Sequence, residues 1–392
     1  MAGWRLSACR FLLSGKDAMN RANICTRHLT LLSRALLGTD GVRSTNRAAS
    51  PVRRDEFFEP LAESVSGVGI DELPELWALA SSHHVILRAF PGLQRVWGSK
   101  DSATAEWIEQ ALVKEQARAH HALAFLSPIC QALEEAGDVI VIKSLDHWPD
   151  LGSDLDLYTN AKSADVVAIM RERFHAHVAK RSWGDRLADK WNFVVPGLPE
   201  LVEVHVARLG QTGEQIAIPR SLAARADTAP FGLHTFKVPA PEDRIIISTL
   251  QRMYRHFYLR LCDLVDNAKL VDCATVDYGY LKSLASSAGV WQGVATYLVI
   301  VSGYVRSYRG ENLSLPAFVT DAARFGNELV HLQRNFLRIP IFPQAASLYA
   351  SQWKTLLFQG DIQSTLRLSL LPGLATAAAL EFRITGNDKG IW

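Results

Sequence analysis

The sequence is poor in cysteine and lacks histidines and cysteines at metal-ligand spacing. Its 392 residues include five cysteines, and no two of them stand as C-x-x-C. This excludes the local pattern of zinc fingers and argues against a disulfide framework, so we expect a reducing, cytoplasmic setting. Cys262 and Cys273 are predicted to be packing residues of helices. The adjacent pairs His83–His84 and His120–His121 cannot share one helix face, so surface positions are expected for them.

Long apolar runs and a strong net charge are also missing. The longest apolar stretches, residues 294–305 and 369–380, fall short of the roughly 18–20 residues that a membrane-spanning helix needs. We therefore expect no transmembrane segment. The net charge is +2, and the ten Lys/Arg and two Asp of residues 1–54 leave the rest of the chain mildly acidic. General nucleic-acid binding is not expected from such a surface.

What the sequence does contain divides it into four segments. Residues 1–54 are rich in Arg and poor in acids, and we interpret them as a basic, disordered extension, with a transit peptide as the alternative. Residues 55–136 are predicted to be helical, with a break at Pro128. Residues 137–240 alternate strand and helix patterns, and residues 241–392 are predicted to be helical. The expected fold is α+β, a small mixed β-sheet flanked by helices and followed by a large C-terminal helical region.

The most informative stretch is the run GSDLDL at residues 152–157. Because successive strand residues point to opposite faces, Asp154 and Asp156 should project side by side while the leucines face the core. Aspartate is depleted in strands, and two neighbouring carboxylates repel unless a cation lies between them. Mg²⁺ prefers such oxygen ligands, and the small Gly152-Ser153 turn could let a phosphate approach the backbone. An ordinary strand entry is the structural alternative.

A third acid follows on another predicted strand. Residues 202–206 read Val-Glu-Val-His-Val, so Glu203 and His205 should share one face. His205 could orient a metal-bound carboxylate or be a structural, hydrogen-bonded histidine. Upstream of the acid pair, residues 138–143 form an apolar, β-branched strand pattern. Three acids on two neighbouring strands are what a two-metal phosphoryl-transfer site requires.

These patterns resemble the polymerase-β-type nucleotidyltransferase superfamily, and within it the uncharacterised bacterial nucleotidyltransferase families. The run Ser153-Asp154-Leu155-Asp156-Leu157 is similar to the acid-pair strand of that superfamily, and residues 202–205 are similar to its acid-x-His strand. The predicted helix across residues 241–266 resembles the later family helix. Lys143-Ser144 stands where the family has a glycine-containing turn, which is a departure from the pattern.

The resemblance implies a metal-dependent transfer of a nucleoside monophosphate from a nucleoside triphosphate, ATP being expected, to an acceptor hydroxyl with release of pyrophosphate. It implies Mg²⁺ or Mn²⁺ as cofactor and a small molecule or sugar as acceptor. The implied metal ligands and catalytic residues are Asp154, Asp156 and Glu203. The implied nucleotide-binding residues are Lys143, Ser144, Gly152 and Ser153.

Two other functions fit the same residues. One is a metal-dependent phosphotransferase that moves a terminal phosphoryl group, and the other is a catalytically silent binding module of a biosynthetic pathway. Arg252, Arg255, His256 and Arg260 are expected to form one basic stripe on a helix. That stripe is either a phosphate-binding face or an internal salt-bridge network.

Overall fold

The N-terminal part of the protein is a set of helices that includes a segment expected to be disordered. The computed structural model describes residues 15–38, 65, 68–98, 102–273 and 275–385. The first described helix, α1 (Gly15–Leu37), buries Leu31 and Leu32 almost completely and packs against α4 (Ile86–Gly98) and a later helix, α12 (Trp291–Arg309). The prediction of a disordered extension is therefore wrong for α1, and residues 1–14 and 39–54 lie outside the described residues.

The helix α5 (Ser102–Glu134) also departs from expectation, because it runs through Pro128 without ending there. A proline inside a helix removes one backbone hydrogen bond and costs about 3 kcal/mol. Its neighbours Leu126 and Ile129 are fully buried. The burial of these flanking side chains offsets the cost, so the predicted break does not form.

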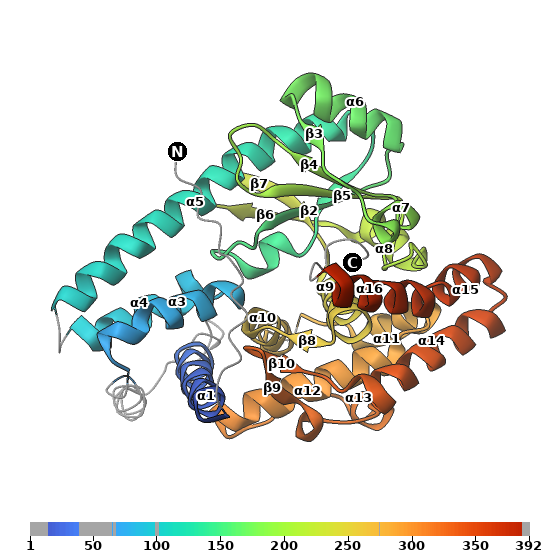
Figure 1. The fold of residues 1–392 in the computed structure, drawn as a ribbon. Helices are drawn as coiled ribbons and strands as arrows, with labels where there is room; N and C mark the ends of the chain where they lie inside the picture. Colours follow the sequence, from blue (N-terminus) through green and yellow to red (C-terminus); the bar gives the residue numbers. More distant parts are fainter. Residues whose placement is uncertain (1–14, 39–64, 66–67, 99–101, 274, 386–392) are drawn as a thin grey trace.

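Five strands form a small mixed sheet in the order β1-β2-β5-β4-β3. The central pair is parallel and the other neighbours are antiparallel. The strands are β1 (Val139–Val141), β2 (Asp154–Thr159), β3 (His177–Val178), β4 (Lys190–Val194) and β5 (Leu201–Val206). Figure 1 shows this sheet in the upper part of the molecule, with α5 and α6 beside it.

The remaining elements extend the α+β architecture toward the C-terminus, which Figure 1 shows as a helical region below the sheet. The helices are α3 (Leu73–Ser82), α6 (Ser163–Phe174), α7 (Trp183–Leu187), α8 (Ala217–Arg225), α9 (Pro241–Thr249), α10 (Leu261–Asp272), α11 (Tyr278–Ser287), α13 (Ala317–Ala322), α14 (Ala346–Phe358), α15 (Ile362–Ser369) and α16 (Leu371–Thr385). The small strands are β6 (Asp227–Phe231), β7 (His234–Val238), β8 (Tyr258–Leu259), β9 (His331–Gln333) and β10 (Phe336–Arg338). The predicted fold class, a small mixed sheet flanked by helices with a large C-terminal helical region, is confirmed.

The segment that links the sheet to the C-terminal helices is not the continuous helix that the sequence predicts. After α9 the chain forms π-helical turns over Leu250–His256, and Phe257 then takes a left-handed conformation with φ of 55°. A short strand, β8, follows before α10 begins. Inserted π turns inside helices are frequent at functional sites, because they redirect side chains.

Across the described ranges, no helix combines the length and the apolarity needed to cross a lipid bilayer.

Candidate functional site

The three predicted acids lie on neighbouring strands of the sheet. Strand β2 pairs with β5 in parallel, and the register places Asp156 directly opposite Glu203. Asp154, Asp156 and Glu203 are partly buried, whereas the alternate residues of both strands are fully buried in the core. The alternation expected from the sequence therefore holds, and it brings the carboxylates onto one face of the sheet.

Two lysines and one histidine lie close to Asp156 and Glu203. Lys143 Nζ lies 2.5 Å from Asp156 Oδ1 and 3.7 Å from Glu203 Oε1. Lys190, a buried residue of β4, places its Nζ 3.0 Å from Glu203 Oε2 and 2.8 Å from Asp185 Oδ1. His205 Nε2 lies 2.9 Å from Glu203 Oε1. Asp156 and Glu203 are thus compensated by lysines of the protein, whereas no ion pair to Asp154 occurs among the described residues.

Lys143 occupies a strained turn at the end of β1. Its φ of 60° and ψ of −56° are those of a classic γ-turn, and the Ser144 N–H donates to the Ile142 carbonyl at 2.6 Å. A non-glycine residue in such a conformation costs on the order of 1–3 kcal/mol, and strain of this kind clusters at functional sites. The chain therefore keeps the backbone shape of a glycine turn while adding a cation that points at Asp156.

Ser144 and Gly152 shape the site through packing. The Ser144 hydroxyl donates to the Asp154 carbonyl at 3.2 Å and accepts from the Asp156 N–H at 2.8 Å, so it ties the turn to β2. Gly152 lies under the ring of His84, and a Cβ there would come within 2.9 Å of His84 Cε1. A larger residue than glycine would displace this ring.

A cavity of about 180 Å³ lies over the acids, and its two walls carry opposite charge. One wall is formed by the acid residues of the sheet. The other comes from the π-helical segment and β8 and is mainly cationic. The lining residues are His84, Lys143, Ser144, His147, Gly152, Ser153, Asp154, Asp156, Glu203, Gln251, Arg252, Arg255, His256, Tyr258 and Arg260. All seven site residues predicted from the sequence line this cavity.

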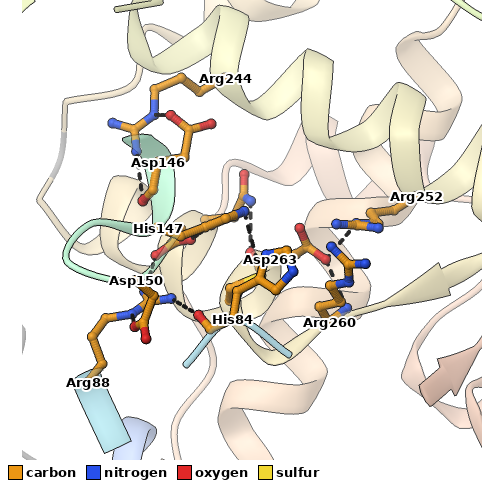
Figure 2. A network of polar contacts seen from close by, with 12 residues as sticks. His84, Arg88, Asp146, His147, Asp150, Arg244, Arg252, Arg260 and Asp263 are labelled. Carbon is orange, nitrogen blue, oxygen red and sulfur yellow. Dashed lines mark hydrogen bonds and ion pairs between the residues drawn. The ribbon is translucent and has the colours of Figure 1, made fainter. Parts of the chain in front are cut away.

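The arginines of the cationic wall fall into two groups. Arg252 is 1% exposed, and its Nε lies 2.6 Å from Asp263 Oδ2, so it belongs to an internal network (Figure 2). Arg255 and Arg260 also line the cavity, and among the described residues neither forms an ion pair with an acid. Among the described residues, no hydrogen-bond partner reaches the buried atoms Arg252 Nη1, Arg255 Nε or Arg260 Nε. Arg252 therefore belongs to the salt-bridge network that was one alternative for the basic stripe, and each of the three arginines keeps a buried guanidinium nitrogen without a hydrogen-bond partner among the described residues.

The acids of the cluster differ in their proton affinity. Burial, together with the charges of Asp156 and Glu203, raises the pKa of Asp154 to about 6, against the opposing effect of Lys143. Burial alone would also raise the pKa of Glu203. The Lys190 charge and the hydrogen bond with His205 outweigh it, and the pKa of Glu203 lies well below its ordinary value. Glu203 is therefore ionised and a poor proton acceptor.

The donor set fits a cation. Ligand atoms of Asp156, Glu203 and His205 all lie within 4.8 Å of one another, which is close enough for one ion to contact all three. Carboxylate oxygens suit Mg²⁺ or Mn²⁺. Asp154 lies two residues before Asp156 on β2 and therefore on the same face. An ion there would have to compete with Lys143 for Asp156.

Several residues lie where the sequence did not predict them. His84, expected at the surface, lies partly buried over Gly152, and its neighbour His83 is fully buried with its Nε2 2.7 Å from the Asn335 carbonyl oxygen. Cys273, expected to pack inside, is exposed. Lys190 carried no motif signal, and only its place on a strand beside β5 could have suggested it.

Comparison with protein-family models, curated proteins and solved structures finds no match to this chain. Functional inference therefore depends on the geometry of the site and on the motif resemblance.

Proposed function

We propose that the protein is a metal-dependent nucleotidyltransferase. It would transfer a nucleoside monophosphate from a nucleoside triphosphate, ATP being expected, to a hydroxyl of a small molecule or sugar in the cytoplasm. One observation carries the proposal: a carboxylate wall on β2 and β5 faces unpaired buried guanidinium donors across one cavity. A polyphosphate with a bound divalent cation matches both walls, since the cation needs the acids and the phosphates need the donors.

The chemistry divides between the walls. Asp154, Asp156 and Glu203 would hold Mg²⁺ or Mn²⁺, which supplies Lewis-acid stabilisation of the phosphate oxygens. Arg255 and Arg260 would bind the β- and γ-phosphates, and Lys143 would balance charge between the phosphates and Asp156. The acceptor oxygen forms a bond to the α-phosphorus, the bond to the β-phosphate bridging oxygen breaks, and pyrophosphate leaves. The acceptor proton would pass to a carboxylate oxygen of the acid cluster or to water.

A smaller adjoining cavity of about 50 Å³ offers room for part of an acceptor. It shares Lys143, Gln251 and Arg255 with the main cavity and is otherwise lined largely by apolar side chains such as Leu209 and Leu250. An acceptor there would lie beside His205, which also lines this space. This setting favours a small molecule with an apolar part over a polymer.

A second function, a binding module without catalysis, has one observation in its favour. Lys143 and Lys190 already neutralise Asp156 and Glu203, so the acids can be stable without a metal ion. Such a module would bind a nucleotide through the arginine wall and release no product. Binding to the wild-type protein that is equal with and without Mg²⁺ would favour this function.

The deciding experiment follows the fate of labelled nucleotide. We expect purified protein with Mg²⁺ or Mn²⁺, a nucleoside triphosphate labelled at the α-phosphate and a mixture of small hydroxyl compounds to yield a labelled acceptor and pyrophosphate. A variant carrying both Asp154→Asn and Asp156→Asn should lose transfer, whereas Asp227→Asn, an exposed acid of β6, should keep it. Transfer of a γ-label instead would identify a phosphotransferase. No transfer and metal-independent binding would leave the binding module.

A further inference from the structure

Three residues that are far apart in the sequence meet beside the cavity. His84 follows α3, His147 follows the Lys143 turn, and Cys262 is the second residue of α10. One ligand atom from each lies within 4.8 Å of the other two. His147 Nε2 and Cys262 Sγ are 3.6 Å apart, and the rings of His84 and His147 stand edge to face with centroids 5.7 Å apart.

The 3.6 Å separation matches the geometry of tetrahedral coordination. Zinc–nitrogen and zinc–sulfur bonds at the usual lengths, meeting at the tetrahedral angle, place the two ligand atoms about 3.6 Å apart. The widest separation in the cluster exceeds the corresponding tetrahedral edge by at most about 1.5 Å, a gap that rotation of one ring would close. His84 can supply that movement, because no described residue forms a hydrogen bond with its buried Nδ1.

The surroundings also have the features of a metal site. Asp266 Oδ2 lies 2.5 Å from His147 Nδ1, so a carboxylate fixes the ring and leaves Nε2 facing Cys262. Carboxylate–histidine pairs of this kind orient metal ligands and raise their basicity. Cys262 lies in the first turn of α10, the end of a helix whose dipole attracts negative charge. Arg88 in turn holds Asp266 and Asp150, as Figure 2 shows for Asp150.

We propose that His84, His147 and Cys262 form a zinc site that is separate from the carboxylate cluster. Imidazole and thiolate ligands suit Zn²⁺ rather than Mg²⁺, and three protein ligands leave a fourth position open. Since His84 and His147 line the cavity and Cys262 does not, that fourth position would face the cavity and take water or an oxygen of the bound ligand. The thiolate and Asp266 would balance the charge of the ion.

A hydrogen-bonded Cys–His pair is the competing explanation, and a catalytic thiol is a poorer one. Cys262 is fully buried and does not line the cavity, so a substrate cannot reach its sulfur. A metal ion, being small, needs only the gap between the three side chains. The hydrogen-bonded pair leaves the buried His84 Nδ1 unexplained, whereas metal binding gives the His84 ring a role.

Cobalt substitution tests the site without any assay of activity. Full-length protein treated with a chelator and then titrated with Co²⁺ alone should develop the near-ultraviolet absorption band of thiolate-to-cobalt charge transfer, saturating at one ion per chain. Added Zn²⁺ should abolish the band. Cys262→Ser should remove it, whereas Cys130→Ser, which alters another buried cysteine, should keep it.

Two further variants make the test specific. His84→Ala should weaken Co²⁺ binding by at least about tenfold, since it removes a direct ligand. The double variant Asp154→Asn with Asp156→Asn should keep the band, because those acids belong to the other cluster. Absence of the band in the wild-type protein would overturn the proposal even if a variant fails to fold. Retention of the band in Cys262→Ser, unchanged affinity in His84→Ala, or loss of the band in the double variant would overturn it as well.

Discussion

At the scale of single residues, the acids of the cluster differ in whether a lysine lies close enough to neutralise their charge. Lys143 and Lys190 approach Asp156 and Glu203 closely, whereas Asp154 forms no ion pair among the described residues. A buried carboxylate without a counter-ion destabilises the folded state when it ionises. Asp154 is therefore the acid whose charge most needs an external cation.

The first prediction concerns the charge of Asp154. Its pKa near 6 lies above the ordinary value, so its contribution to stability is fully present below about pH 4 and is lost as pH rises through about 6. Without divalent cations, Asp154→Asn should be more stable than the wild type at pH 7.5, by on the order of 1–3 kcal/mol, and equally stable near pH 4. Urea unfolding at both pH values measures this, with Asp227→Asn as the control. Equal stability at pH 7.5 would contradict it.

The second prediction concerns the backbone at Lys143. Lys143→Gly and Lys143→Ala both lose the ion pair to Asp156, but glycine adopts positive φ without strain whereas alanine keeps the strain. Lys143→Gly should therefore be more stable than Lys143→Ala by about 1 kcal/mol. Both variants should bind Mg²⁺ more tightly than the wild type, because the competing cation is gone. The measurements are denaturant unfolding and isothermal titration with Mg²⁺; an alanine variant at least as stable as the glycine variant would refute the strain.

At the scale of elements, α1 links the beginning of the chain to its centre. Its leucines pack against α4 and α12, and Ser33 Oγ lies 2.7 Å from the Tyr304 hydroxyl of α12. The long-range contacts of this helix join two segments that are far apart in the sequence. Its removal would expose apolar surface on both neighbours.

The third prediction follows from this packing. Leu32 is fully buried, so Leu32→Ala should reduce the free energy of unfolding by about 2–5 kcal/mol. Asn23→Ala, an exposed change on the same helix, should have little effect. A variant that lacks residues 1–38 should lose more stability than Leu32→Ala. Thermal and urea unfolding test all three, and an unchanged melting temperature on truncation would show that the helix does not support the fold.

At the scale of the whole molecule, the cavity is built from separate parts of the chain. The acids lie on the sheet, and the arginine side chains belong to residues 250–260. His84 lies between α3 and α4 in the N-terminal part of the chain. A ligand that contacts both charged walls would hold these parts together. Stabilisation by such a ligand should therefore spread beyond the residues that touch it.

The fourth prediction tests whether one ligand contacts both walls of the cavity. Mg²⁺ with a non-hydrolysable ATP analogue should slow amide hydrogen exchange both in β2–β5 and across residues 250–260. Mg²⁺ alone should protect mainly β2 and β5, since only the acids contact it. The double variant Asp154→Asn with Asp156→Asn should lose most of the Mg²⁺-dependent protection. Protection confined to one wall would contradict a ligand that bridges the cavity.

The sequence alone determined the alternation that puts Asp154, Asp156 and Glu203 on the strand faces opposite the buried leucines and valines, because side-chain direction in a strand follows directly from residue order. It also determined the mixed α+β class, since strand and helix periodicities differ. It did not determine that α1 packs, that α5 continues through Pro128, or that Phe257 interrupts the predicted helix. For α1 and α5, burial against other elements outweighs the local preference.

Only the tertiary structure decided what surrounds the acids. Lys190 reaches Glu203 because β4 pairs with β5, and the arginine wall faces the sheet because a π-helical turn redirects the chain. His84, His147 and Cys262 have no spacing that a sequence pattern could reveal, since they come from three separate segments. Contacts between distant segments depend on packing of the whole core, which residue order specifies only collectively. The direction of the acid side chains could therefore be predicted from the sequence, whereas the residues that contact them could not.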